Sequence, residues 1–308
     1  MKKLNQSEKK VLTILEQNAR MPASKIAKET RLSSEGVIKI INRLQERKII
    51  YKFNTKINYS LMGQEIYPVH IKLNQINSEI IKKIKKIIQK HNSCAWHSFV
   101  EGEYDLMLSF KVKTKKDKED MTKLLQELRD YILDKEVSLI IDSFEISKSF
   151  VKKQGKVFLT TNNLVEQIKL DSEELNLLNL LRKNSRQTVL ELAKKLNSTA
   201  RIVAGKIKKL EKSEIISGFK IKVNTALLGY QPCTALISLS SYTNEDLRKF
   251  ITYCKYKEGI HYLIHQMGKY DINLTIDAIN INEFYQIVSE IRDEFPFIKK
   301  ITTLISKF

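Results

Sequence analysis

Apolar residues recur at helical spacing in three short stretches near the start of the chain. The pattern predicts a first helix that ends near Asn18, a second helix that begins at Pro22, and a third helix capped by Ser33. The inward positions of the first and third helices are Val11, Leu12, Ile14, Leu15, Val37, Ile40, Ile41 and Leu44. Residues 49–53 then follow as a strand of a small wing. This order is typical of a winged helix-turn-helix.

The next stretch, residues 65–147, alternates strand and helix patterns. Strands are predicted at 66–73, 96–100, 106–112 and 137–146, and helices at 77–91 and about 117–131. Residues 101–105 form the hairpin between the second and third strands. The order βαββαβ is the ferredoxin-like plan, in which both helices cover one face of a sheet.

The whole pattern recurs at an offset of 166 residues without a gap. Asn18 and Arg20 correspond to Asn184 and Arg186 in the first third of the repeat. Gly102, Tyr104 and Asp105 of the hairpin correspond to Gly268, Tyr270 and Asp271. A period this long exceeds that of solenoid repeats, so each copy is expected to contain complete domains.

The fold class is therefore predicted as α+β, with two winged helix-turn-helix domains and two ferredoxin-like βαββαβ domains in tandem. The expected domains are 1–64 and 170–230 for the winged helices, 65–147 and 231–308 for the βαββαβ domains, and 148–169 for a basic linker.

The formal net charge of +19 is concentrated in parts of this plan. Residues 1–64 hold 14 basic and 5 acidic residues, residues 148–169 hold 5 and 1, and residues 170–230 hold 12 and 6. The two βαββαβ segments are balanced, with 14 of each and 9 of each. Such a concentrated excess is typical of a module that binds a polyanion, so double-stranded DNA is the expected partner.

The third helix of each winged helix is the expected DNA reader. Residues near its start would reach base edges, and later basic residues would hold phosphates. The outward residues are Ser34, Glu35, Ile38, Lys39, Asn42 and Arg43 in the first copy, and Arg201, Lys206, Lys208 and Lys209 in the second, where Ser198 or Thr199 is the cap. A solvated helix face would look similar, but the repetition within the two winged-helix segments, which both carry an excess of basic residues, favours DNA contact.

Other chemistry finds little support. Cys94, Cys233 and Cys254 are odd in number and form no C-x-x-C, which argues against disulfides and a zinc finger. His261 and His265 lack further ligands at metal-site spacing, so no metal site is predicted. No nucleotide-binding glycine motif occurs, and no cofactor is expected. No long apolar run or signal peptide is present, so we expect a cytoplasmic protein with no membrane partner.

Taken in order, these motifs resemble the Lrp/AsnC family of feast/famine transcription regulators. The resemblance rests on Asn18-Ala19-Arg20, Ala27, Ser33, Leu44, Gly63 and the Gly-x-Tyr-Asp of the hairpin, and it covers nearly the whole chain twice. It implies a transcription regulator that binds DNA with its winged helices and is not an enzyme. It also implies self-association through the βαββαβ domains, within the chain or as a homo-oligomer.

Members of this family commonly hold an amino acid or similar small effector near the hairpin. The residues that the resemblance assigns to this role are Gly102, Tyr104, Asp105, Gly268, Tyr270 and Asp271. A purely structural role in a tight turn explains glycine and aspartate equally well. The chain departs from the usual pattern at Ile40, where a basic residue such as Lys206 of the second copy is common.

The alternative is an enzyme similar to the sirohaem decarboxylases, which share this architecture. His97 with Tyr104 loosely resembles their histidine followed by Tyr-Asn-Leu-Trp. Asp105 and Met107 replace the asparagine and tryptophan, and Leu263 lies opposite His97 in the second copy. The sequence therefore favours the regulator.

Overall fold

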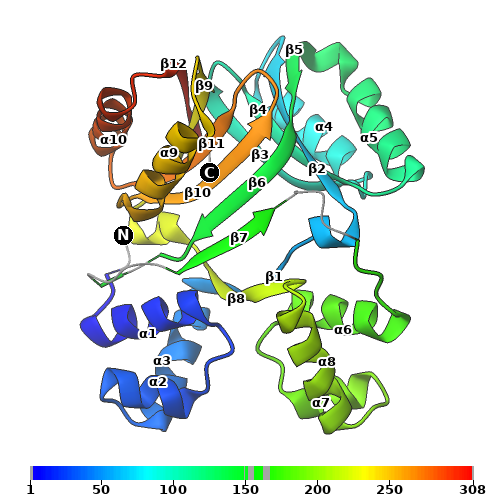
Figure 1. The fold of residues 1–308 in the computed structure, drawn as a ribbon, viewed down its shortest axis with the longest axis vertical. Helices are drawn as coiled ribbons and strands as arrows, with labels where there is room; N and C mark the ends of the chain where they lie inside the picture. The colour runs from blue at the N-terminus through cyan, green and yellow to red at the C-terminus, as the bar shows by residue number, and fades with distance from the viewer. Residues whose placement is uncertain (1–2, 149, 152–155, 162–166, 307–308) are drawn as a thin grey trace. The chain divides into compact units, whose positions relative to one another are not determined.

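The computed structural model describes residues 3–148, 150–151, 156–161 and 167–306 (Figure 1). They divide into two compact units, and each unit combines segments from both copies. The first unit is formed by Met1–Met62, Glu145–Thr160 and Glu166–Tyr230, and the second by Gly63–Phe144, Thr161–Val165 and Gln231–Phe308. The two winged helices therefore belong to one unit and the two βαββαβ segments to the other.

The first unit contains two copies of the same short series of elements. The first copy comprises α1 (Gln6–Gln17), α2 (Ala23–Thr30), α3 (Ser34–Glu46), β1 (Ile50–Ile57) and the 3-10 helix η1 (Ser60–Met62). The second comprises α6 (Ser172–Lys183), α7 (Val189–Lys195), α8 (Ala200–Lys212), β8 (Ile216–Val223) and η3 (Thr225–Leu228).

Side-chain caps fix where the third helices begin. The Ser33 hydroxyl accepts a hydrogen bond from the backbone N–H of Gly36 at 3.0 Å, as the sequence predicts. In the second copy Thr199, rather than Ser198, caps α8 by accepting from the N–H of Ile202 at 3.3 Å. Each cap satisfies a backbone donor that the helix leaves unpaired.

The strand expected to form a local wing pairs with the other copy instead. β1 and β8 form a two-stranded antiparallel ribbon in which Asn54 lies opposite Lys220. Phe53 lies opposite Ile221 and Thr55 opposite Phe219. Because Phe53 is equivalent to Phe219 and Thr55 to Ile221, the strand register is symmetric between the two copies. Neither copy supplies a second local strand to this ribbon, and the exposed edge of each strand is satisfied by its counterpart.

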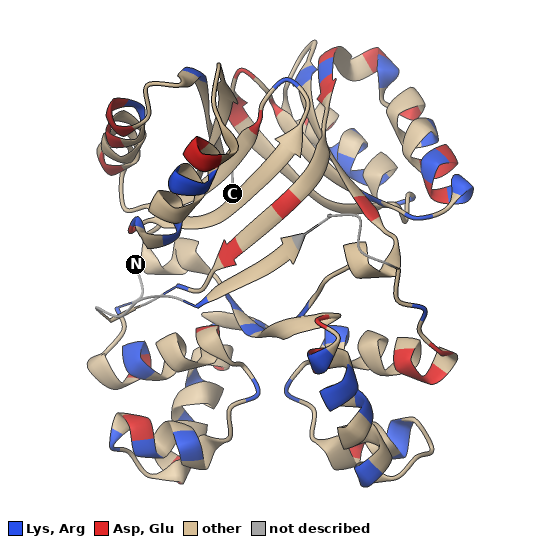
Figure 2. Cartoon of the chain, viewed as in Figure 1, with Lys and Arg blue, Asp and Glu red and all other residues tan. Residues whose placement is uncertain are grey.

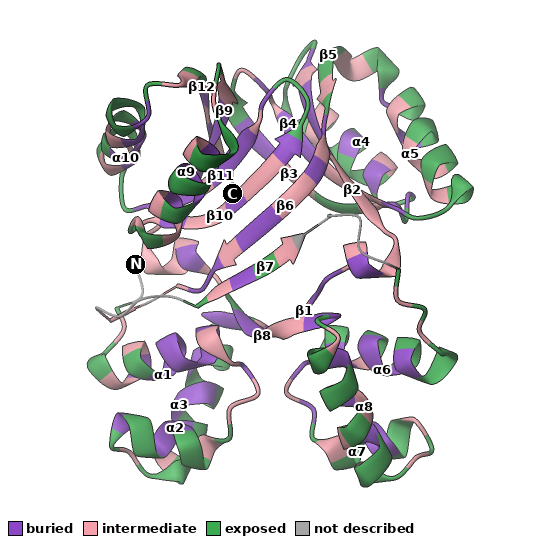
Figure 3. Cartoon of the chain, viewed as in Figure 1, coloured by how far each residue is buried: buried purple, intermediate pink, exposed green. Residues whose placement is uncertain are grey.

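One apolar core runs through both winged helices. It includes Leu12 and Leu44 from the first copy and Leu178 and Leu210 from the second, each no more than 4% exposed. Figure 3 shows that the helices of both winged helices carry buried as well as exposed segments. Because the core is shared, the two winged helices of this unit stabilise one another.

The second unit holds the two βαββαβ segments. The first comprises β2 (Glu65–Leu73), α4 (Ser78–Ile88), β3 (Cys94–Gly102), β4 (Leu106–Val112), α5 (Lys115–Glu127), η2 (Arg129–Tyr131), β5 (Ile132–Val137) and β6 (Leu139–Ile146). The second comprises β9 (Gln231–Leu239), α9 (Asn244–Tyr256), β10 (Ile260–Met267), β11 (Ile272–Ala278), α10 (Ile281–Glu294) and β12 (Ile298–Ser306).

The strand order confirms the ferredoxin-like plan in both copies. The first copy contributes the order β5-β2-β4-β3 and the second the order β12-β9-β11-β10. The last strand of each copy also reaches the other copy: β6 lies beside β10, and the end of β12 pairs with β3, with Leu304 opposite Gly102. The two copies therefore build one continuous sheet.

The end of the first βαββαβ segment differs from its prediction. We expected a helix over 117–131 and one strand over 137–146, but α5 ends at Glu127 and the strand region begins at Ile132. Ser138 separates β5 from β6, and its N–H donates to the carbonyl of Pro68 at 2.9 Å. β5 is an edge strand with mostly exposed side chains, including Leu133, so its sequence lacks the apolar alternation that would reveal it.

Part of the expected linker 148–169 is also structured. β7 (Val157–Thr161) follows a backbone hydrogen bond of 2.8 Å from Ser147 N–H to the Lys156 carbonyl. Phe158 is buried against Gly218, where an added Cβ would lie 2.4 Å from the phenyl ring. Residues 149, 152–155 and 162–166 of this segment lie outside the described residues.

Two Gly→Ala substitutions should have opposite effects on stability. Gly102 has a φ of +138°, and an added Cβ would lie 2.6 Å from the Thr303 carbonyl oxygen. Gly102→Ala should therefore lower the free energy of unfolding by roughly 2 kcal/mol or more. Gly205 lies within α8 with open space around it, so Gly205→Ala should raise that free energy by about 0.5–1 kcal/mol. Urea unfolding of the full chain measures both, and an unchanged midpoint for Gly102→Ala would contradict the strained position.

Candidate functional site

The outward face of α3 is accessible along its length. All six residues predicted as DNA contacts in the first copy are exposed: Ser34, Glu35, Ile38, Lys39, Asn42 and Arg43. Ser34 and Glu35 lie in the first turn, which is the end that approaches base edges in a helix-turn-helix. Ile38 is 47% exposed although it is apolar, and an exposed apolar side chain at this position suits contact with a thymine methyl group.

The outward face of α8 differs in its charge. Figure 2 shows several basic residues along this helix. Arg201 and Lys208 are exposed. Lys206 instead forms ion pairs with Glu173 at 2.8 Å and Asp171 at 3.4 Å, and its hydrogen bond with Glu173 raises its pKa. Lys206 is therefore held against the start of α6 in this structure.

One basic residue in each reader helix is held by a buried glutamate. Arg43 lies 3.1 Å from Glu8, and at the equivalent position Lys209 lies 2.6 Å from Glu174. Both glutamates are 2% exposed and belong to capping boxes at the starts of α1 and α6. The side chains of Lys209 and Arg43 remain 68% and 50% exposed, so these residues are positioned by the glutamates but still accessible.

Sequence reasoning missed the arginines that join the two winged helices. The Arg20 guanidinium donates to the carbonyl of Gln187 at 3.0 Å, and Arg186 donates to the carbonyl of Met21 at 3.2 Å. Each guanidinium also lies over a phenylalanine ring of the other copy, Arg20 over Phe219 and Arg186 over Phe53. Their identity at offset 166 was visible, but only the pairing of the copies gives the repeated Asn-x-Arg a role across the interface.

A buried cluster of charges lies beside the β1–β8 ribbon. Lys220 is 5% exposed and lies 3.0 Å from Glu16 and 2.9 Å from Glu145. Burial alone would lower the pKa of Lys220, but the two carboxylates raise it above its usual range. Glu16 also accepts a hydrogen bond from the Lys148 N–H at 3.0 Å. Lys56 forms a further ion pair with Glu145.

In the second unit, the aspartates of the two predicted effector hairpins hold backbone groups. Asp105 accepts from the N–H of Leu73 at 2.9 Å, and Asp271 accepts from the N–H of Leu239 at 2.7 Å. Asp105 also lies 3.2 Å from the Lys72 ammonium. These contacts fasten each hairpin to the end of a neighbouring strand.

The other predicted hairpin residues lie where the two copies meet. Tyr104 and Tyr270 are almost fully buried, and their hydroxyls lie 3.3 Å apart. Gly102 and Gly268 both have positive φ, and a Cβ at Gly268 would lie 2.4 Å from the Ser138 hydroxyl. The structure thus brings the equivalent hairpins of the two copies into direct contact.

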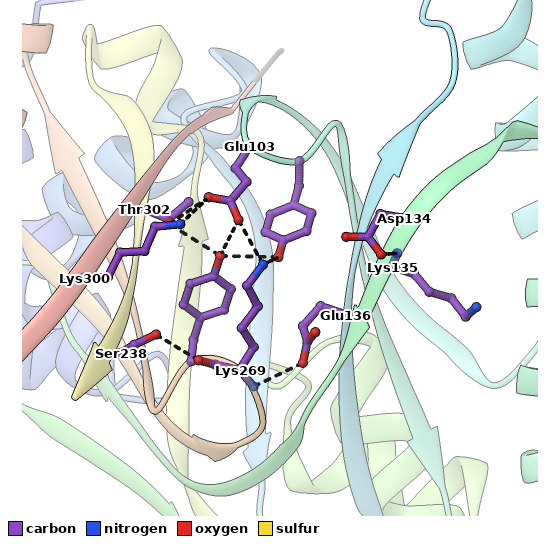
Figure 4. Close-up of polar contacts among 10 residues, drawn as sticks. Glu103, Asp134, Lys135, Glu136, Ser238, Lys269, Lys300 and Thr302 are labelled. Carbon is purple, nitrogen blue, oxygen red and sulfur yellow. Dashed lines mark hydrogen bonds and ion pairs between the residues drawn. The ribbon is translucent and has the colours of Figure 1, made fainter. Parts of the chain in front are cut away.

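Between these tyrosines lies a polar network that sequence reasoning missed (Figure 4). The carboxylate of Glu103 accepts from Lys269 at 3.0 Å, Lys300 at 3.1 Å and the Tyr270 hydroxyl at 3.0 Å. Thr302 donates to it at 3.1 Å. Burial opposes ionisation of Glu103, but these donors lower its pKa to about 2. The available signal was the opposite charge of Glu103 and Lys269 at offset 166.

A histidine lies buried beside this network. His70 is fully buried against the rings of Tyr104 and Tyr270, and neither ring nitrogen has a hydrogen-bond partner in the described part of the chain. Burial, with the nearby Lys269 ammonium, lowers the pKa of His70 to about 4. The imidazole is therefore neutral near pH 7.

The remaining candidates are dispersed. His261 lies 3.9 Å from Asp277, and His265 lies 3.6 Å from Asp142. Among the described residues no three metal-ligating side chains form a group. His97 is partly exposed on β3, and its second-copy counterpart is the fully buried Leu263. No helix in the described ranges is long and apolar enough to cross a bilayer.

Comparison with known proteins connects these sites to a family. The profile of the winged helix-turn-helix DNA-binding family matches residues 4–51 and 170–217. The chain is 40% identical over 109 residues to the HTH-type transcriptional regulator LysM of Sulfurisphaera tokodaii, covering 35% of this chain and 74% of that protein. It is 34% identical over 126 residues to an uncharacterized HTH-type transcriptional regulator of Pyrococcus horikoshii, covering 38% of this chain and 84% of that protein.

A solved structure matches almost the whole chain. The siroheme decarboxylase NirDL aligns over 98% of this chain and 91% of its own, with a TM-score of 0.66 and 14% identity. At that identity the likeness shows a shared fold alone. The sequence relatives, by contrast, are transcription regulators, and the winged helix-turn-helix profile matches both winged helices described above. The chain therefore belongs to the Lrp/AsnC family of DNA-binding transcription regulators, of which it carries two units in one polypeptide.

Proposed function

We propose that this regulator binds one composite operator through two unlike readers held in a single body. The observation that carries the proposal is the joining of both winged helices by the β1–β8 ribbon, while their reader helices differ in chemistry. Glu35 corresponds to Arg201, Ile38 to Ala204 and Lys39 to Gly205. A symmetric pair of identical readers requires a palindromic operator, whereas unlike readers favour two different half-sites.

The charge of the readers supports phosphate contact. Lys39, Lys208 and Arg201 are exposed cations on the outward faces of α3 and α8. Arg43 and Lys209 are held at defined positions by buried glutamates, which reduces the conformational entropy that DNA binding would cost them. These residues are proposed to position the protein, and Ser34, Glu35, Ile38 and Asn42 to face base edges.

The hairpin region is the proposed effector site. Tyr104 and Tyr270, whose hairpins are fastened by Asp105 and Asp271, lie beside the Glu103 carboxylate and the ammonium groups that bind it. Glu103 and Lys269 offer both charges that an amino acid carries. A zwitterionic ligand could exchange with these internal ion pairs, which supports an amino acid or similar metabolite as the effector.

We infer that the chain acts by binding rather than by catalysis. The decarboxylase-like alternative would use His97, but its second-copy counterpart Leu263 is apolar and buried. The hairpin also has Asp105 and Met107 where the enzyme pattern has asparagine and tryptophan. The shared fold alone therefore does not favour that chemistry over regulation.

Binding to duplex DNA should depend steeply on salt. With 6 to 10 phosphate contacts, affinity should fall by about 10³ to 10⁵ between 50 and 200 mM salt. Replacing Lys39 or Lys208 with alanine should reduce the slope of log K against log salt by about 0.9 for each phosphate that is no longer neutralised. Mobility shifts over a salt series measure this, with Lys82→Ala, an exposed lysine of α4, as the control. A salt-insensitive shift would count against both readers.

Selection from a random-sequence library should return two different half-sites. The Glu35→Arg variant gives the first reader the residue of the second at that position, so it should change the preferred bases in one half-site and leave the other unchanged. Sequencing of the selected pools compares the wild type with this variant. A perfectly palindromic consensus, or a change in both halves, would contradict the two unlike readers.

A thermal-shift screen of the twenty amino acids and common metabolites should identify at least one effector. A ligand at 100 times its Kd stabilises the folded state by about 2.7 kcal/mol and so raises the melting temperature. Asp105→Asn or Asp271→Asn keeps an acceptor for the backbone but removes a charge, and should weaken the shift.

The same screen separates the two functions. An iron tetrapyrrole should give neither a thermal shift nor a change in its Soret band, and a clear change in that band would favour the decarboxylase-like alternative. If no compound shifts the melting curve, or if every shift survives both aspartate substitutions, the hairpins act only in assembly.

A further inference from the structure

Equivalent positions of the two copies meet one another in both units. In the first unit, Asn54 lies directly opposite Lys220, its counterpart at offset 166. In the second, Glu103 forms an ion pair with its counterpart Lys269 at 3.0 Å, and Tyr104 meets Tyr270. A residue at such a position would face an identical copy of itself if two like copies paired.

We propose that the two copies carry different charges at or beside these meeting points, so that each copy accepts only the other copy as its partner. Two first copies would not pair with each other, and neither would two second copies. The partner surface is therefore defined by opposite charge across a relation that is otherwise symmetric.

The second unit carries the clearest exchange. Glu103 faces Lys269 and also binds Lys300, while the positions equivalent to Lys300 and Thr302 are Asp134 and Glu136. In a pair of first copies, Glu103 would meet another Glu103, with Asp134 and Glu136 in place of the donors that now bind it. Several carboxylates would then share one partly buried site, which is unfavourable.

A pair of two second copies would be unfavourable because positive charges would face each other. In a pair of second copies, Lys269 would meet another Lys269 beside Lys300, and no carboxylate from position 103 would be present. The backbone N–H of Lys269 would also lose Glu136, which accepts from it at 3.1 Å in the actual pairing. Opposite charges suit only the unlike pair.

The first unit repeats this logic with different residues. Lys220 is buried, and its ammonium contacts Glu16 of the other copy at 3.0 Å. The position equivalent to Glu16 in the second copy is Arg182. A pair of second copies would place two buried lysines opposite each other, with arginines where the carboxylate now lies, whereas a pair of first copies would bury Glu16 without its ammonium partner.

Other contacts between the two copies are the same in both directions and involve no difference in charge. Arg20 and Arg186 make matching hydrogen bonds to backbone carbonyls, and the rest of the ribbon register is symmetric. These contacts would form equally in like and unlike pairs. Discrimination therefore rests on the exchanged charges and not on the general shape of the interface.

A charge-exchange series in the full chain tests the recognition. Glu103→Lys places a third ammonium beside Lys269 and Lys300, and should lower the melting temperature by roughly 5 °C. Glu103→Lys combined with Lys269→Glu and Lys300→Glu restores opposite charges in reversed order, and should recover most of that decrease. Lys135→Glu reverses a charge on an exposed residue of β5 that points away from the network, and should change the melting temperature little. A harmless Glu103→Lys, or no recovery in the triple variant, would overturn the proposal.

Cysteine reporters test which copies pair. In a Cys94→Ser background, Asn54→Cys faces lysine in an unlike pair but a second cysteine in a pair of first copies. Oxidation should therefore leave a single-chain species on a non-reducing gel. Lys52→Cys with Lys222→Cys, which lie opposite each other, should instead close a disulfide within the chain. Covalent two-chain products from Asn54→Cys, or failure of the second pair to close, would overturn the pairing of unlike copies.

Discussion

The antiparallel pairing of β1 with β8 is the interaction on which the DNA-binding half of this protein depends. Each strand lacks a neighbouring strand from its own copy in the ribbon, and the counterpart strand of the other copy pairs with its backbone. The pairing brings the apolar faces of the two winged helices into one core and sets the guanidiniums of Arg20 and Arg186 against carbonyls of the opposite copy. The two winged helices thereby share one core.

The two copies of the βαββαβ unit also pair through their strands, but within one larger sheet. The last strand region of each copy contacts both copies: β5 lies beside β2 and β6 beside β10, while β12 pairs with β9 along most of its length and with β3 at its end. Gly102 and Gly268 allow the hairpins to approach the neighbouring backbone closely, and Tyr104 and Tyr270 fill the space between them. Because the contact is this close, the charged side chains at its centre must be complementary, as Glu103 and Lys269 are.

Duplication within one chain removes a restriction that identical subunits impose. In a symmetric pair every substitution appears twice. A residue at a position that meets its own equivalent must therefore pack favourably against an identical side chain. Two linked copies diverge independently. The pairs Asn54 and Lys220, and Glu103 and Lys269, occupy equivalent positions with different chemistry, and the reader helices differ in the same way at Glu35 and Arg201. The interface and the DNA-reading surface thus both differ between the two copies, while the fold that supports them remains the same.

The sequence by itself determined the local elements and the repeat. Helical periodicity and caps such as Ser33 specify the winged helices, and apolar strands with the Gly-x-Tyr-Asp hairpin specify the βαββαβ order, since these depend on neighbours close in the chain. Only the tertiary structure decided which copy each strand joins, the edge strand β5, and the partners of Glu103 and Lys220. Those outcomes depend on groups far apart in the chain or on strands with little apolar pattern, so no local signal encodes them. The charge exchanges were visible in the sequence, but their meaning required knowing which equivalent positions meet in space.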